Sequence, residues 1–108
     1  MKQLKYFVLE NGKCPFLIWL NELDKITRAR IDSRLTRLAC GNYGEYKQLD
    51  GNISELKLKF GSGYRIYYTE KNNTIIILLC AGDKKTQSKD IKKAKEYYCL
   101  LKGNEDDK

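Results

Sequence analysis

Histidine is absent from this chain of 108 residues. It is the side chain that titrates nearest to neutral pH, so the proton-transfer role that it fills in many enzymes is excluded here. The sequence also lacks any run of about 18 apolar residues, the length that a membrane-spanning helix needs. The apolar stretch near the N-terminus is too short, and too soon interrupted by polar residues, to be a signal peptide. We therefore expect a cytoplasmic protein with no membrane partner.

Cysteine does not occur in the patterns that bind metals. The four cysteines, Cys14, Cys40, Cys80 and Cys99, form no C-x-x-C pair, and there is no histidine to complete a zinc site. In a reducing compartment we expect buried or inert thiols. The sequence thus predicts neither a metal site nor a cofactor.

Acidic residues are outnumbered by basic ones, 14 to 21, which gives a formal net charge of +7. This balance favours a polyanionic partner, either nucleic acid or an acidic protein, although a merely soluble basic protein has the same charge. Hydrophobic residues make up 42% and charged residues 32% of the chain, as in ordinary globular domains. The length fits one domain, which we place at residues 1–102, followed by a polar tail at 103–108.

The apolar spacing predicts helices near both ends of the chain. Residues 14–23 carry apolar side chains at i, i+3, i+4 and i+7 from Phe16, and Pro15 suits a first helical position. A second helix is expected at residues 24–40, ending before Gly41. A last helix begins near residue 86, with apolar positions 91, 94, 98 and 101 on its inner side.

The second helix also carries Arg30, Arg34 and Arg37, which repeat at helical spacing away from its apolar stripe. We interpret this row as a solvated helix face. The alternative is that this arginine row binds phosphates or a partner protein.

Strands are expected at residues 4–9, within 41–52, and at 53–60, 64–70 and 74–81. The segment 'KNNT' predicts a tight hairpin, because Asn tolerates positive φ. The segment 'TIIILLCA' shows no alternation, which indicates a central strand buried on both faces. The resulting order predicts an α+β fold with a mostly antiparallel sheet of four to five strands, two N-terminal helices and one C-terminal helix.

Alternation in the strands separates an apolar face of the sheet from a polar one. If the helices cover only the apolar face, the other face displays cationic and aromatic side chains, with two more lysines where the last strand ends. These residues are Glu55, Lys57, Lys59, Arg65, Tyr67, Lys84 and Lys85. Such a rigid cationic surface suits a polyanion.

Four segments of the sequence resemble a known family: 'FLIWLNELD', 'RARIDSRLTRLACGNYGEYKQL', 'ISELKLKFGSGYRIYY' and 'LLCAGDKKTQSKDIKKA'. They are similar to the addiction-module killer proteins, also called phage-derived or HigB-like toxins, of the RelE/ParE superfamily of type II toxin–antitoxin systems. The resemblance covers about residues 3–101, and the patterns GNxG, GxGYRxYY and GDKxTQxxDI make it specific. The chain departs from the usual pattern at Ser62 for proline, Lys57 for arginine and Ala81 for glycine.

The resemblance implies a RelE/ParE-like fold, a compact sheet with helices packed on one side. It implies mRNA cleavage on the translating ribosome, held in check by an antitoxin encoded beside the toxin. Antitoxins of this branch are often helix-turn-helix proteins, so the chain is expected to meet operator DNA only through its antitoxin.

RNA cleavage without a metal proceeds by attack of the ribose 2′-OH on the neighbouring phosphate, which needs a base, an acid and added positive charge. The resemblance places the strand arginine, Arg65, at the scissile phosphate, where a permanently charged planar donor is suited to the task. Lys84 is expected to stabilise charge or donate a proton, and Lys57 to add charge. Glu55 acts as the base or orients Arg65. The plain alternatives are surface lysines and a strand arginine in a cross-strand ion pair with Glu55 or Glu70.

Four further residues, Lys47, Lys59, Tyr67 and Lys85, are expected to contact RNA. Tyr67 would stack on a base or donate a proton, although packing is the commoner role of a tyrosine on a sheet face. Asp83 is expected to cap or turn the chain.

Two other functions fit the same sequence. A ParE-type gyrase inhibitor shares the fold, and a non-catalytic toxin would serve only as corepressor with its antitoxin. An unrelated RNA-binding domain is disfavoured because no aromatic platform motif occurs.

Overall fold

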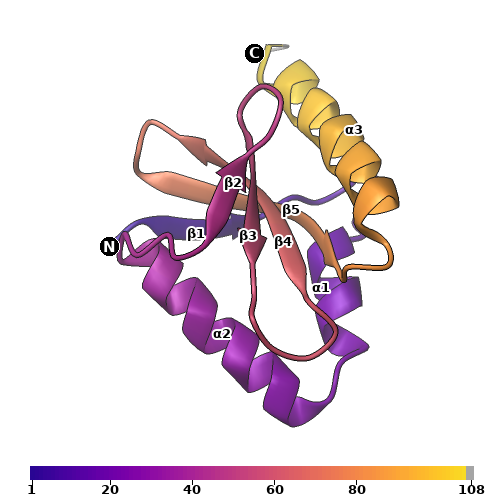
Figure 1. Cartoon of the computed structure of the whole chain (residues 1–108). Coiled ribbons are helices and arrows are strands. Elements are labelled where there is room, and N and C mark those ends of the chain that lie inside the picture. The colour runs from indigo at the N-terminus through magenta and orange to yellow at the C-terminus, as the bar shows by residue number, and fades with distance from the viewer. Residues whose placement is uncertain (107–108) are drawn as a thin grey trace.

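A mixed five-stranded sheet in the order β1-β5-β4-β3-β2 forms the centre of the protein (Figure 1). The computed structural model describes residues 1–106. The strands are β1 (Gln3–Tyr6), β2 (Tyr46–Gln48), β3 (Ile53–Lys57), β4 (Arg65–Lys71) and β5 (Ile75–Gly82). β1 runs parallel to β5, and the other neighbouring strands are antiparallel. The predicted α+β class with a mostly antiparallel sheet is confirmed.

Two N-terminal helices cover one face of this sheet, as the apolar spacing predicted. α1 (Pro15–Asn21) has its proline in the first turn, where a missing N–H costs nothing. α2 (Lys25–Ala39) is capped by Asp24, whose carboxylate accepts a hydrogen bond from the Thr27 backbone N–H at 3.2 Å. The apolar cluster beneath these helices includes Phe16, Ile31, Leu38, Leu56, Ile66 and Leu78.

The C-terminal helix α3 (Gln87–Asp106) packs on the opposite face (Figure 1). It forms a second apolar cluster with the sheet, whose members include Phe7, Ile53, Tyr67, Leu79, Ala94 and Tyr97. The expectation of helices on a single face is therefore wrong. The apolar side chains on both faces of β5 need cover on both sides, and α3 supplies the second layer.

α3 continues into the segment 103–108 that was expected to be a polar tail, as far as Asp106. Residues 107 and 108 lie outside the described part of the chain. Among residues 1–106, no helix combines the length and the apolar composition that a membrane crossing requires.

β5 lies between β1 and β4, and its residues from Ile76 to Gly82 are all buried. This confirms the interpretation of the uninterrupted apolar run as a strand buried on both faces. The β4–β5 hairpin turns at Asn72 and Asn73, which have φ of 54° and 57°. Asparagine tolerates this left-handed backbone, as the hairpin prediction required.

Candidate functional site

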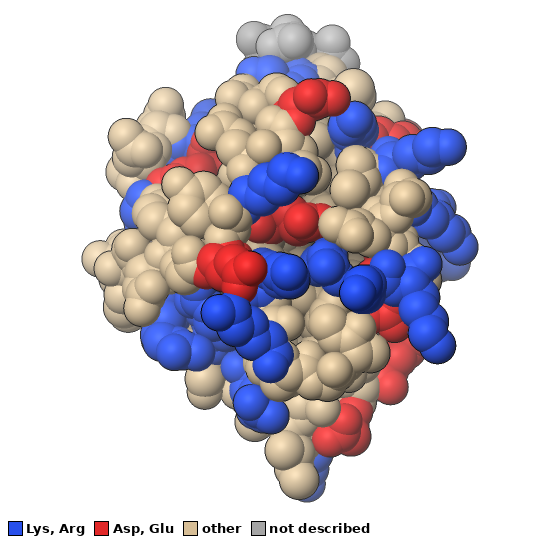
Figure 2. Space-filling model, in the orientation of Figure 1, with Lys and Arg blue, Asp and Glu red and all other residues tan. Residues whose placement is uncertain are grey.

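The strand register brings most of the candidate residues into two rows on the α3 side of the sheet. Side chains directly opposite each other on paired antiparallel strands share a face. The first row is Lys47, Glu55, Tyr67 and Cys80. The second row is Lys57, Arg65 and Gly82. Figure 2 shows Lys and Arg side chains gathered across the middle of the molecule, with acidic side chains among them.

Glu55 is the centre of a buried polar network in these rows. Its Oε2 accepts hydrogen bonds from the Tyr67 hydroxyl at 2.9 Å and from Gln87 Nε2 at 2.9 Å. Arg65 Nε lies 3.9 Å from the same oxygen, and Glu55 and Arg65 are only 5% and 6% exposed. The ion pair with Glu55 is therefore real, but Arg65 is not the exposed strand arginine of the plain alternative.

The guanidinium of Arg65 is held by the turn before β4 as well as by Glu55. Its Nη1 donates a hydrogen bond to the Gly63 carbonyl at 2.9 Å, whereas the buried Nε has no hydrogen-bond partner. A buried donor without a partner is costly in a folded protein. The Nε–H of the positively charged Arg65 guanidinium is therefore a hydrogen-bond donor that no group among residues 1–106 uses.

Lys84 and Arg65 both lie beside Gly63. The Lys84 backbone N–H donates to the Ser62 carbonyl at 3.4 Å, which ties the end of β5 to the turn before β4. A Cβ on Gly63 would lie 3.4 Å from the Lys84 Cβ and 3.5 Å from Arg65 Nη1. Gly63 also has φ of +76°, a conformation that glycine adopts without strain. The structure thus brings the backbone and Cβ of Lys84 beside the turn that holds the Arg65 guanidinium, although the two residues are 19 positions apart in the sequence.

Lys57 and Lys59 both form ion pairs with Glu45. Lys57 Nζ lies 3.7 Å and Lys59 Nζ 3.4 Å from the carboxylate oxygens of Glu45. Their side chains are 47% and 79% exposed. Lys57 is opposite Arg65 in the register, so it forms the solvent-facing rim of the site, and Lys59 is linked to it through Glu45.

Tyr67 does not have the position that its RNA-binding role required. It is 0% exposed, because α3 covers this part of the sheet, and its ring cannot stack on a base. Burial first, and then the hydrogen bond to Glu55, raise the pKa of its phenol. The hydroxyl therefore stays protonated and serves as a donor to Glu55.

The remaining candidates lie at the edges of the network. Lys47 and Lys85 are exposed, Lys47 on the outermost strand and Lys85 after β5. Asp83 turns the chain as predicted, because its Oδ1 accepts the backbone N–H groups of Lys85 at 2.9 Å and Thr86 at 3.2 Å.

Two residues that build this network escaped the sequence analysis. Gln87 donates to Glu55 from the first turn of α3, and its place in the TQ pair of GDKxTQxxDI was the available signal. Gly82 ends β5 and faces the first turn of α3, where a Cβ on it would come 1.7 Å from Asp90 Oδ2. Its small size lets α3 approach the sheet and position Gln87.

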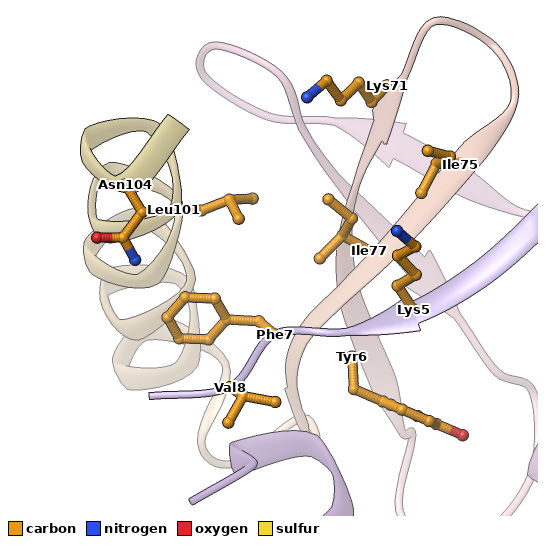
Figure 3. A pocket seen from close by; sticks show the side chains of 9 residues that line it. All are labelled: Lys5, Tyr6, Phe7, Val8, Lys71, Ile75, Ile77, Leu101 and Asn104. Carbon is orange, nitrogen blue, oxygen red and sulfur yellow. The ribbon is translucent and has the colours of Figure 1, made fainter. Parts of the chain in front are cut away.

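A different hollow, of about 330 Å³, lies between β1, β5 and α3 (Figure 3). Phe7, Ile77 and Leu101 line it together with Lys5 and Lys71. It shares no residue with the Arg65–Glu55 network, so we assign it no part in the chemistry of that site.

The chain is thus a small basic α+β domain whose sheet holds a buried arginine–glutamate pair with exposed lysines near it. Residues 18–98 match the family model described as phage-derived protein Gp49-like (DUF891). The chain belongs to this family, which is a RelE/ParE-like toxin family of toxin–antitoxin systems.

The sequence is also similar to that of an uncharacterized protein of Haemophilus influenzae. The two are 46% identical over 78 residues, which cover 71% of this chain and 79% of the relative. Membership of a toxin family confirms the broader part of the resemblance and implies an antitoxin partner. The matched segment 18–98 contains all the candidate site residues.

Proposed function

We propose that this chain is a toxin of the addiction-module killer, HigB-like branch that cleaves mRNA on the translating ribosome without a metal. The observation that carries the proposal is the buried guanidinium of Arg65, fixed by Glu55 and the Gly63 carbonyl beside Lys84. A preorganised cation of this kind stabilises the charge that develops on a phosphate during attack.

In the proposed reaction the ribose 2′-oxygen attacks phosphorus and the bond to the 5′-oxygen breaks. The products are a 2′,3′-cyclic phosphate and a 5′-hydroxyl. Arg65 holds the phosphate, and Lys84 donates the proton that the 5′-oxygen gains. Lys57 and Lys59 bind the RNA backbone at the rim of the site.

We assign Glu55 two roles in the reaction, positioning Arg65 and acting as the base. Its Oε2 accepts from Tyr67 and Gln87 and faces Arg65, which supports a positioning role. Oε1 accepts neither of these bonds, so the same carboxylate is left with an oxygen to take the 2′-OH proton.

The scarcity of acid–base groups supports a requirement for the ribosome. A ribosome that holds mRNA in an in-line geometry would supply much of the rate by orientation alone. We place the reaction in the cytoplasm, and we propose a helix-turn-helix antitoxin through which the toxin would reach operator DNA.

The test is to express the wild type and Arg65→Ala and to map mRNA 5′ ends with and without active translation. Arg28→Ala is the matched control, because Arg28 lies on α2, outside the arginine–glutamate network. Circular dichroism checks that each variant folds. We expect cleavage only in the wild type and the control, and only during translation.

Each other outcome rejects a stated part of the proposal. Cleavage by a folded Arg65→Ala variant removes Arg65 from the mechanism, and cleavage without translation removes the ribosome. Intact transcripts with damaged DNA indicate a ParE-type gyrase inhibitor instead. Intact transcripts and an unaltered growth effect in Arg65→Ala indicate a corepressor.

A further inference from the structure

A second cationic hollow, of about 270 Å³, lies between α2 and the chain that leaves β3. Its charged lining consists of Arg30, Arg34, Arg37, Lys57, Lys59 and Glu45. We call this hollow the α2 groove. It gathers five cationic side chains around a single carboxylate, so it attracts anions.

Arg34 is the deepest cation of the α2 groove and lacks a counter-charge. It is 8% exposed, and its Nη1 donates to the Asn42 carbonyl at 3.0 Å. Its Nη2 is buried against Gly44 and has no hydrogen-bond partner. Burial and the neighbouring Arg37 lower the pKa of Arg34. Buried charges are normally paired, and no carboxylate among residues 1–106 pairs with this one.

The outer part of the α2 groove holds a guanidinium in a fixed orientation. The Arg30 guanidinium carbon lies 4.0 Å from the centre of the Phe60 ring, which fixes its plane. A stacked guanidinium keeps its edge N–H groups free for a phosphate. Arg37 lies two turns further along α2 on the same face.

Glu45 occupies the position that an incoming anion would take. Its carboxylate pairs with both Lys57 and Lys59, at 3.7 and 3.4 Å. The three side chains are between 46% and 79% exposed, so these pairs contribute little to folding. An anion with more charge than one carboxylate can displace Glu45 at small cost.

We propose that the α2 groove binds a backbone phosphate of the RNA strand whose scissile phosphate lies at Arg65. This inference rests on the proposed function and extends it to a second contact on the substrate. Lys57 connects the two places, because it is opposite Arg65 in the β3–β4 register and also lines the groove. A polyanion with regularly spaced charges follows such a path, which favours RNA over an isolated acidic side chain.

The first test measures binding of a 12-nucleotide 2′-O-methyl RNA, which cannot be cleaved because it lacks the attacking hydroxyl. The variant Arg30→Gln/Arg37→Gln removes two exposed charges from the groove. The control Lys25→Gln/Arg28→Gln removes two charges from the same helix outside it. We expect about fivefold weaker binding for the groove variant than for the control. The slope of log affinity against log salt should fall by about 0.7 for each phosphate that the variant no longer neutralises.

The second test uses Glu45→Gln, with the exposed Glu22→Gln as control for the change in net charge. Removing the competing carboxylate should tighten RNA binding about threefold relative to Glu22→Gln. Equal affinities of variant and control in either test overturn the proposal. So does a groove variant that loses binding to a polyglutamate peptide and keeps its affinity for RNA.

These results are separable from the test of cleavage. If Arg65→Ala abolishes cleavage and the groove variants bind like their controls, the nuclease stands and the groove assignment fails. If the groove variants lose binding and Arg65→Ala still cleaves, the groove stands and the catalytic assignment fails.

Discussion

Individual hydrogen bonds stabilise the buried carboxylate of Glu55. The carboxylate is 5% exposed and accepts from Tyr67 and Gln87, while Arg65 lies within ion-pair distance. A buried charge with several partners is stable only while those partners remain, because each bond that is removed leaves part of the charge unsolvated.

Tyr67→Phe removes one donor to Glu55 and little volume. We expect it to lower the free energy of unfolding by about 1–3 kcal/mol, because the carboxylate remains buried with one bond fewer. If the proposed mechanism holds, the change also lowers the rate of RNA cleavage, since Arg65 is then less firmly oriented. Urea unfolding and a cleavage assay measure both effects.

Tyr98→Phe is the matched control for this change. It removes the hydroxyl that accepts from Asn52 Nδ2 at 2.8 Å in an exposed position. We expect a loss of no more than about 0.5 kcal/mol and no effect on cleavage. Equal losses in the two variants would contradict the argument from burial.

Among the elements, α3 completes the buried polar network around Glu55. It buries Tyr67 and brings Gln87 to Glu55 from the far end of the sequence. Its approach depends on Gly82, where a Cβ would meet Thr86 Oγ1 at 2.6 Å as well as Asp90 Oδ2.

Gly82→Ala is therefore expected to push the first turn of α3 away from the sheet. We predict a loss of about 1–3 kcal/mol in the free energy of unfolding, the usual cost of overpacking. Gly103→Ala, within α3, is the control, and its effect on the free energy of unfolding should have the opposite sign. A Cβ there meets nothing within 4 Å, so alanine should stabilise the helix by about 0.5–1 kcal/mol. Thermal or urea unfolding of the pair tests this, and a neutral Gly82→Ala would contradict it.

The elements themselves were readable from the sequence, and their contacts were only partly so. The helix expected at residues 24–40, the turn at Asn72 and Asn73, and the buried β5 each follow from local sequence patterns. Alternation assigned Arg65 and Tyr67 to the same face correctly. Alternation says nothing about whether a distant helix covers that face, so the burial of Tyr67 and the contact of Gln87 were missed.

The whole molecule contains several buried groups that must stay protonated. Burial raises the pKa of Tyr67, that of Tyr68 to about 12 and that of Cys80 to about 12. For each of them the pKa in the folded state lies above its unfolded value. Their contribution to stability is therefore complete below the unfolded pKa values of about 8.5–10 and is lost as the pH rises above them.

We predict that the free energy of unfolding falls steeply between about pH 9 and pH 12. Urea titrations at a series of pH values measure it. Cys80→Ala removes one titrating group, so its stability should fall less between about pH 9 and pH 11 than that of the wild type. The exposed Cys99→Ala serves as control and should retain the wild-type slope. A flat profile for the wild type would show that the buried groups do not control alkaline unfolding.

The parallel pairing of β1 with β5 has a consequence for the synthesis of the protein. Gln3 is paired with Ile75 and Tyr6 with Leu78, so the first strand must wait for more than half of the chain before its partner exists. Contacts so distant in sequence raise the contact order and slow folding. Arg65 and Glu55 acquire their setting later still, when α3 has left the ribosome and docked. A nascent chain truncated before α3 therefore carries Glu55 and Arg65 without the hydrogen bond from Gln87 and without the apolar cover that α3 provides.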